Sequence, residues 1–266
     1  MNKAESAVLE LRAMDDLAAQ DSPMHRLAPL SKLAVTVVYI FTVVSFSKYD
    51  LTGLLPMVLF PAVGYVLAGI PVSTCFQKLG IILPLVCAVG ILNPFFDRGI
   101  LVRLGPLSVS GGVVSMLSLM LKGVLCLMAS FLLAATTPIE EICRALRQLH
   151  VPKMITSLLL LTFRYVSVLL EETSIMTEAY HLRAPGQKGI HVSAWGSFLG
   201  QLLLRSMDRA EALYESMLLR GFRGEFFYNG PRRNPTGSWV FAAAVIPLIL
   251  LVRRYNIPDL LGSLFV

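Results

Sequence analysis

Five apolar runs constrain this chain more than any other feature of its sequence. With its flanks, each run can supply the ~20 residues that a helix needs to cross the hydrocarbon core of a bilayer. Only 15% of the 266 residues are charged, whereas about a quarter of the residues of a soluble domain are charged. We therefore expect an all-α polytopic membrane protein with about five transmembrane helices. The runs are Leu33–Phe46, Leu51–Ile70, Leu79–Leu92, Val113–Ala135 and Trp239–Val252.

A more polar segment separates the fourth run from the fifth and divides the chain into three parts. We expect residues 1–135 to hold the N-terminal segment and four transmembrane helices, residues 136–236 a cytoplasmic helical region, and residues 237–266 the last transmembrane helix and a tail. Of the 23 Lys and Arg, 12 lie between Thr136 and Gly237. The positive-inside bias places such a segment, and with it the N-terminus, in the cytoplasm. Stacking aromatics do not accompany these cations, so we expect no nucleic-acid partner.

The polar segment is predicted to contain two long helices, from Pro152 to about Ala184 and from about Ala194 to Arg220. A shorter helix precedes them, and the sequence Thr137-Pro138-Ile139-Glu140 predicts a capping box at its start. Ser193 is the expected N-cap of the second long helix. The segment therefore has the pattern of one short and two long helices joined by brief loops.

Both long helices end in Leu-Arg, in the sequences "YHLRAPG" and "MLLRGFRG". A cation at a helix C-terminus is favoured by the helix dipole, and a following glycine closes the helix in the left-handed conformation. These two effects account for a single Arg-Gly end. The recurrence of Leu-Arg at two helix ends favours a second interpretation, in which the arginines dock onto another protein.

These motifs resemble the transmembrane T component of energy-coupling factor (ECF) transporters, most closely its CbiQ-like cobalt branch. The resemblance covers nearly the whole chain, although Ala28 stands where the family commonly has an acid. The stretches that carry it are "SPMHRLAPLSKLA" (Ser22–Ala34), "ILNPFF" (Ile91–Phe96), "FRYVSVLLEE" (Phe163–Glu172) and "SMDRAEALYESMLLRGFRG" (Ser206–Gly224).

In that family, two Ala-Arg-Gly-type motifs end coupling helices and insert into grooves on two ABC-type ATPase subunits. The resemblance implies that Leu182-Arg183-Ala184 and Leu219-Arg220-Gly221 are the docking motifs here. Leucine replaces the leading alanine in both, and Ala184 replaces the glycine of the first. Five charged residues are weaker candidates for supporting the coupling helices, by ion pairs or simply as solvated charges: Arg164, Glu171, Glu172, Asp208 and Glu211.

The resemblance also implies the role of the chain. It would hydrolyse nothing itself and would transmit ATP-driven motion from two ATPase subunits to a separate substrate-binding integral membrane subunit, within the lipid of the cell membrane. Cobalt is the first implied substrate and nickel the second. We expect no cofactor on this chain, with ATP and Mg²⁺ on the partner subunits. The four Cys and four His are scattered and have no metal-ligand spacing.

Two other classes of protein stay open at this point. A membrane-embedded enzyme, such as a lipid or prenyl transferase, usually needs paired acids, but Glu171 and Glu172 are adjacent and diverge on a helix. A standalone permease usually needs intramembrane carboxylates. Lys122 is the only charged residue in the first four runs, and it either snorkels or contacts a partner. A complete fifth span would place Arg253 and Arg254 outside, against the charge bias.

Overall fold

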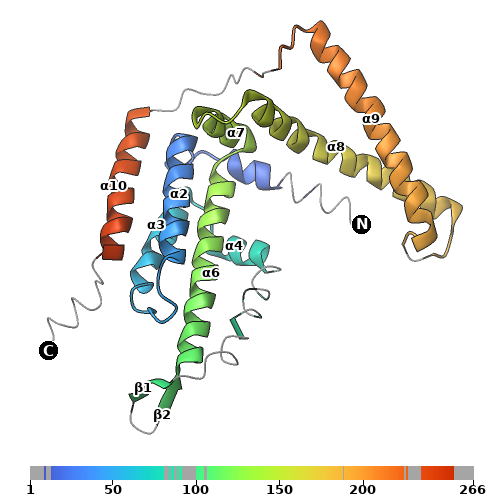
Figure 1. The fold of residues 1–266 in the computed structure, drawn as a ribbon. Coiled ribbons are helices and arrows are strands. Elements are labelled where there is room, and N and C mark those ends of the chain that lie inside the picture. Colours follow the sequence, from blue (N-terminus) through green and yellow to red (C-terminus); the bar gives the residue numbers. More distant parts are fainter. Residues whose placement is uncertain are drawn as a thin grey trace. The chain divides into compact units, whose positions relative to one another are not determined.

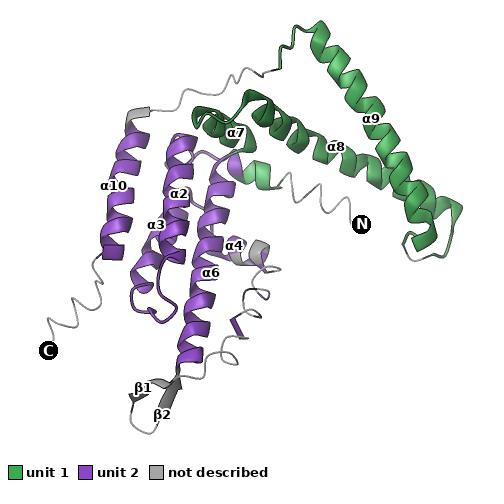
Figure 2. Ribbon diagram, viewed as in Figure 1, with its two compact units in different colours: residues 1–17, 138–231 green, residues 18–137, 232–266 purple. Residues whose placement is uncertain are grey.

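The computed structural model describes residues 13–80, 100–104, 107–187, 189–224 and 235–254, with single positions 9, 84, 86, 88, 90, 91 and 226. The described chain is predominantly helical (Figure 1). It divides into two compact units (Figure 2). One contains Met1–Leu17 with Pro138–Pro231, and the other contains Ala18–Thr137 with Arg232–Val266. We call them the coupling unit and the membrane unit.

The membrane unit contains most of the predicted apolar runs as helices. Its elements are α2 (Pro29–Val44), the 3₁₀ helix η1 (Leu55–Val58), α3 (Leu59–Ala68), α4 (Val72–Leu79), the hairpin β1 (Ile100–Leu104) and β2 (Leu107–Ser110), α6 (Gly111–Thr136) and α10 (Pro235–Arg254). The antiparallel hairpin was not expected. The third predicted run, Leu79–Leu92, lies mostly outside the described residues.

Three described helices are long and apolar enough to cross a membrane: α6, α10 and α8 (Lys153–Arg183). Helix α2 and the segment Leu55–Ala68 are apolar but shorter. The all-α membrane class predicted from the sequence is thus confirmed. Helix α8 meets the criterion by length and composition alone, and its placement in the cytoplasm stays a prediction from the charge pattern.

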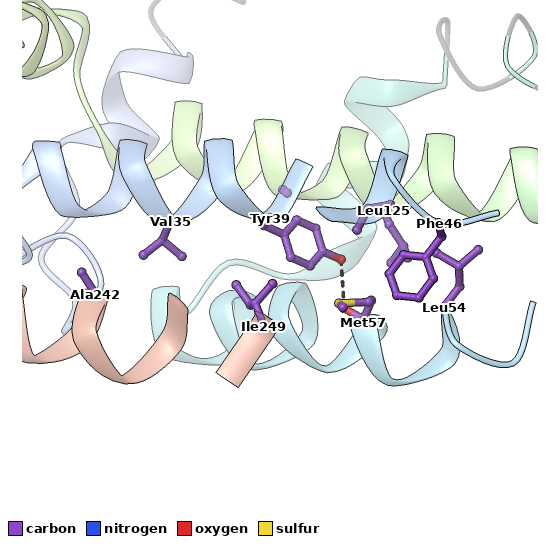
Figure 3. Packing of buried hydrophobic residues seen from close by; sticks show 10 residues of the cluster. Val35, Tyr39, Phe46, Leu54, Met57, Leu125, Ala242 and Ile249 are labelled. Atoms are coloured by element: carbon purple, nitrogen blue, oxygen red, sulfur yellow. Dashed lines mark hydrogen bonds between the residues drawn. The ribbon is translucent and has the colours of Figure 1, made fainter. Parts of the chain in front are cut away.

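The core of the membrane unit forms where α2 packs between α10 and α6 (Figure 3). Tyr39 lies at its centre, fully buried, with its ring 4.6 Å from that of Phe60. The Tyr39 hydroxyl donates a 2.9 Å hydrogen bond to the Met57 carbonyl (Figure 3). Pro61, four residues after Met57, has no N–H with which to bond that carbonyl. Tyr39 therefore satisfies the backbone group that the proline leaves without its helical partner.

Helices α2 and α10 run parallel, because they meet at both ends. At their starts, the Ala28 N–H donates to Ser238 Oγ at 2.7 Å. At their far ends, Arg253 Nη2 donates to the Ser45 carbonyl at 2.9 Å, and its guanidinium lies 4.2 Å from the centre of the Phe46 ring. Helix α10 therefore extends along the whole of α2.

Lys122 of α6 is the second cation at the far end of α2. Its ammonium donates a 2.5 Å hydrogen bond to the Phe46 carbonyl. Phe46 follows Ser45, the C-cap of α2, and the helix dipole favours a cation near this end of the helix. Lys122 and Arg253 thus join α6 and α10 to the last turn of α2. Lys122 therefore has a hydrogen-bond partner within its own chain.

The coupling unit consists of α7 (Ile139–Gln148), α8, the 3₁₀ helix η2 (Val192–Ala194) and α9 (Trp195–Leu219). Two predicted caps differ from those observed. Pro138 is the N-cap of α7, so Thr137 precedes the cap, and its buried hydroxyl has no hydrogen-bond partner in the part of the chain that the structure describes. The N-cap of α9 is Ala194 and not Ser193. Ser193 lies in η2, which the imidazole of His191 caps by accepting the Ser193 N–H. Both capping errors are shifts of one residue along the chain.

Candidate functional site: two exposed arginine helix ends

Helix α8 ends at Arg183, as the sequence predicts. Leu182 is 84% exposed, and the Arg183 side chain is also exposed. Ala184 follows as the C-cap with φ of −126°, outside the left-handed region. A glycine is not required for this conformation, so the alanine fits the first motif without backbone strain. The left-handed residue comes two positions later, at Gly186 with φ of 91°.

Helix α9 ends at Leu219, which is 90% exposed, with Arg220 as its C-cap. Gly221 has φ of 80°. The Phe222 N–H donates to the Met217 carbonyl at 2.9 Å, and the Gly221 N–H donates to the Leu218 carbonyl at 2.9 Å. This pair of bonds is the Schellman motif, which needs a left-handed residue at the position of Gly221. The second motif therefore requires its glycine, whereas the first does not.

Neither Arg183 nor Arg220 forms an ion pair with any described residue. Arginine presents a planar fork of donors that suits carboxylates and backbone carbonyls. An exposed leucine precedes each arginine, so both helix ends offer an apolar side chain beside a cation. Such a pair is suited to insertion into a groove on another protein.

The two arginines lie at opposite ends of α9. Arg183 is at the elbow between α8 and α9, where the Tyr180 hydroxyl donates to Gln187 Oε1 at 2.9 Å and accepts the His191 N–H at 3.3 Å. Arg220 follows the far end of α9, which has 25 residues and a length of about 37 Å at 1.5 Å per residue. The two ends are therefore too far apart to enter one small groove.

One glutamate on α8 joins the middle of the two long helices. Glu172 pairs with Arg205 through Oε1, and its Oε2 lies 3.6 Å from Arg209 Nη2. The Glu172 side chain is 17% exposed, so the cluster is partly shielded from solvent. The two arginines are four residues apart and share one face of α9. Their spacing was visible in the sequence, but nothing in one helix alone identifies its partner on another.

The other four support candidates are placed without such a partner. Among the described residues, no ion pair is formed by Arg164, Glu171, Asp208 or Glu211. Glu171 precedes Glu172 in α8, and a helical step of 100° directs its side chain away from the face that contacts α9. Glu172 is thus the candidate that the structure brings to the helix crossing.

The chain beyond Arg220 returns to the beginning of α8. Ser157 Oγ donates to the Gly224 carbonyl at 3.4 Å, and Arg147 Nη1 of α7 donates to the Phe226 carbonyl at 3.2 Å. The rings of Phe222 and Phe226 lie 5.0 Å apart. The second arginine end is therefore tied through its own C-terminal extension to both α7 and α8. Sequence reasoning missed Arg147 and Ser157 because these bonds join residues 67 to 79 positions apart.

The titratable groups of the coupling unit bear on whether it could hold a metal ion. Among the described residues, no group of three or more His, Cys, Asp or Glu could hold a metal ion. Burial and the nearby Glu140 raise the pKa of the Cys143 thiol, which keeps it neutral and unreactive at physiological pH. Partial burial, Asp16 and Glu140 raise the pKa of Asp15. The surroundings of both groups therefore explain the direction of their pKa shifts.

A helical membrane unit and a unit of long helices with two exposed arginine ends agree with the ECF transmembrane component that the sequence resembles. The profile of the cobalt transport protein family CbiQ matches residues 20–228. The chain belongs to this family. The match covers α2 to α9 and both arginine motifs.

Individual relatives agree with the family. The energy-coupling factor transporter transmembrane protein EcfT of Lactococcus lactis is 26% identical over 87% of this chain and 93% of that protein. The cobalt transport protein CbiQ of Rhodobacter capsulatus is 34% identical over 35% of this chain and 38% of that protein. The nickel permease LarQ of Lactiplantibacillus plantarum is 28% identical over 44% of this chain and 41% of that protein.

Proposed function

We propose that this chain couples ATP hydrolysis on two partner ATPase subunits to a separate substrate-binding membrane subunit. One observation carries the proposal: the two long helices of the coupling unit each end in an exposed Leu-Arg pair, and neither arginine has an ion-pair partner among the described residues. A separation of about the length of α9 would let the two ends reach two different subunits. ATP and Mg²⁺ would be bound by those subunits.

The mechanism is mechanical. Closure of the ATPase pair would displace the two arginine ends, and the ion pairs of Glu172 with Arg205 and Arg209 would make α8 and α9 move as one body. Packed helices carry such a displacement as shear or hinge motion. The hydrogen bonds of Ser157 and Arg147 to the chain behind Arg220 would deliver it to α7.

The test is to solubilise the tagged chain gently from its native membrane and identify the proteins that accompany it. We expect one or two ABC-type ATPases and a small integral membrane subunit. Arg220→Glu and Arg183→Glu should each abolish association with an ATPase, because an acid reverses the charge that enters the socket, while the variant stays in the membrane. Glu215→Arg, an exposed charge reversal within α9, is the matched control and should leave association unchanged.

Association that survives both arginine substitutions would contradict the docking role. Recovery of the chain alone from several mild detergents would contradict the whole proposal and favour a membrane-embedded enzyme.

The cargo we propose is a divalent transition-metal ion, cobalt or nickel. The relatives named for cobalt and nickel each match less than half of this chain, while the longer match to EcfT carries no metal in its name. Uptake of ⁵⁷Co²⁺ and ⁶³Ni²⁺ by cells that express the complete transporter would distinguish the two metals. ATP-dependent uptake of neither metal would remove the metal assignment and leave the coupling role standing.

A further inference from the structure

Two buried basic side chains surround the C-terminal end of α6. Lys32, in the first turn of α2, is 2% exposed, and its ammonium donates to the Thr136 carbonyl at 2.6 Å. His25 is also 2% exposed, and its Nε2 lies 3.2 Å from the Ala135 carbonyl. The carbonyl can only accept, so Nε2 carries the proton and donates. The other ring nitrogen, Nδ1, lies 2.7 Å from Ser22 Oγ.

These contacts occupy the groups that a helix end leaves unsatisfied. The last four carbonyls of a helix have no intrahelical partner, and the dipole favours a cation beside them. Burial of an ammonium group is costly unless it is fully hydrogen-bonded. An apolar side chain would occupy the position of Lys32 without that cost, but it could not hold the α6 carbonyls.

We call the contacts of Lys32 and His25 with the end of α6 the clamp. The clamp lies next to the boundary between the two units. Thr136 is the last residue of α6, and the chain passes from the membrane unit to the coupling unit between Thr137 and Pro138. Helix α7 starts at Ile139. The clamp therefore holds the backbone of the membrane unit directly before the chain enters α7.

We infer that Lys32 and His25 are positioning residues that fix the end of α6 to the start of α2, so that displacement of α7 moves both membrane helices. Without the clamp, the last turn of α6 would fray and absorb the displacement. The inference rests on the proposed coupling function and names the joint at which that function acts.

The test uses the complete transporter complex in lipid nanodiscs and amide hydrogen exchange with and without ATP and vanadate. In the wild-type complex, nucleotide should change exchange both in α7 and in residues 18–32. In Lys32→Met the α7 response should persist, while the response of residues 18–32 should fall by about fivefold or more, the lower end of common coupling factors. Lys32→Arg, which keeps a donor cation, should keep the nucleotide response of residues 18–32.

Lys122→Met is the matched control. Lys122 also donates to a backbone carbonyl, that of Phe46, but this carbonyl lies just beyond the end of α2 that is remote from the joint. This variant should retain the nucleotide response of residues 18–32. An equal loss in Lys122→Met and Lys32→Met would show a general loss of stability and overturn the inference.

A Lys32→Met complex that keeps the full response of residues 18–32 would also overturn it. If Lys32→Met does not assemble, His25→Phe carries the test, because it keeps a ring and removes both nitrogens. It should reduce the response in the same direction, and an unchanged response would overturn the inference. A wild-type complex in which α7 itself does not respond would instead contradict the proposed function.

Discussion

At the scale of single residues, three polar side chains of the membrane unit bind backbone carbonyls that lie in apolar surroundings. Tyr39 donates a hydrogen bond to the Met57 carbonyl, Lys122 donates to that of Phe46, and Lys32 donates to that of Thr136. In hydrocarbon no water can replace such a partner, so each unsatisfied group is costly. These three polar side chains of the membrane unit are thus accounted for by the backbone carbonyls that they bind.

The partnership of Tyr39 with Pro61 gives a prediction that a double-mutant cycle can test. Tyr39→Phe leaves the Met57 carbonyl without its donor and should lower the free energy of unfolding by about 1–3 kcal/mol. Pro61→Ala restores a backbone N–H to that carbonyl, so Tyr39→Phe should cost less in the Pro61→Ala background. Thermal unfolding in detergent measures both steps.

Tyr214→Phe is the control for removal of a hydroxyl, since Tyr214 is 54% exposed on α9, and it should leave the unfolding free energy within about 0.5 kcal/mol. Equal costs of Tyr39→Phe in the two backgrounds would contradict the role assigned to Pro61.

The two arginine motifs differ in the backbone conformation of the residue after arginine. Gly221→Ala places a Cβ at φ of 80° and should destabilise the end of α9 by about 1–2 kcal/mol. Ala184→Gly should not tighten the first end, because φ at position 184 is −126°. Amide exchange in residues 216–222 measures the first effect, and in residues 180–187 the second.

Gly200→Ala is the matched control within α9, where an added Cβ meets nothing within 4 Å. It should raise helix stability by up to about 1 kcal/mol. An end of α9 that is equally protected in Gly221→Ala would contradict the Schellman assignment.

At the scale of elements, α8 and α9 are joined by a small charged cluster and not by an extensive apolar interface. Many of their large apolar side chains are exposed, including Met154 at 80% and Leu203 at 61%. Glu172, Arg205 and Arg209 form the charged contact at the crossing of the two helices. The elbow at Tyr180 and the bonds to Gly224 and Phe226 hold the two ends.

Removal of the glutamate should therefore loosen the pair. We expect Glu172→Gln to destabilise the crossing by about 1 kcal/mol, a value suited to a partly exposed pair, and to raise amide exchange in the middle of α9. Glu171→Gln, which removes the neighbouring charge that faces away, is the control and should have no such effect. A charge exchange, Glu172→Arg with Arg205→Glu and Arg209→Glu, should recover part of the protection. Amide exchange in the middle of α9 that is unchanged in Glu172→Gln would mean that the cluster does not hold the helices.

At the scale of the whole molecule, the parallel course of α2 and α10 determines the topology of the C-terminus. Because the two helices begin together and end together, the end of α10 should lie on the membrane face opposite the N-terminal segment. Arg253 and Arg254 would then be at the outer surface, where Arg253 is retained by the Ser45 carbonyl. With this orientation, the hydrogen bond of Arg253 to the Ser45 carbonyl would offset the charge bias against this arginine.

Labelling of single cysteines in intact cells tests this topology. In a variant without the four native cysteines, a membrane-impermeant maleimide should react with Arg254→Cys and not with Arg26→Cys, whose native side chain is 74% exposed at the start of α2. Permeabilised cells should show both reactions. Labelling of Arg26→Cys alone in intact cells would reverse the orientation, and labelling of both would contradict a full crossing of α10.

The sequence by itself determined the all-α membrane class, the positions of most helices and the two Leu-Arg helix ends. These features depend on local composition and periodicity, which a linear reading contains. The tertiary structure decided which charges meet. Glu172 finds Arg205 and Arg209, Tyr39 replaces the donor missing at Pro61, and Arg253 retains the end of α2. Such pairs join residues distant in sequence, and their energy depends on burial and on distances that only the packed helices set.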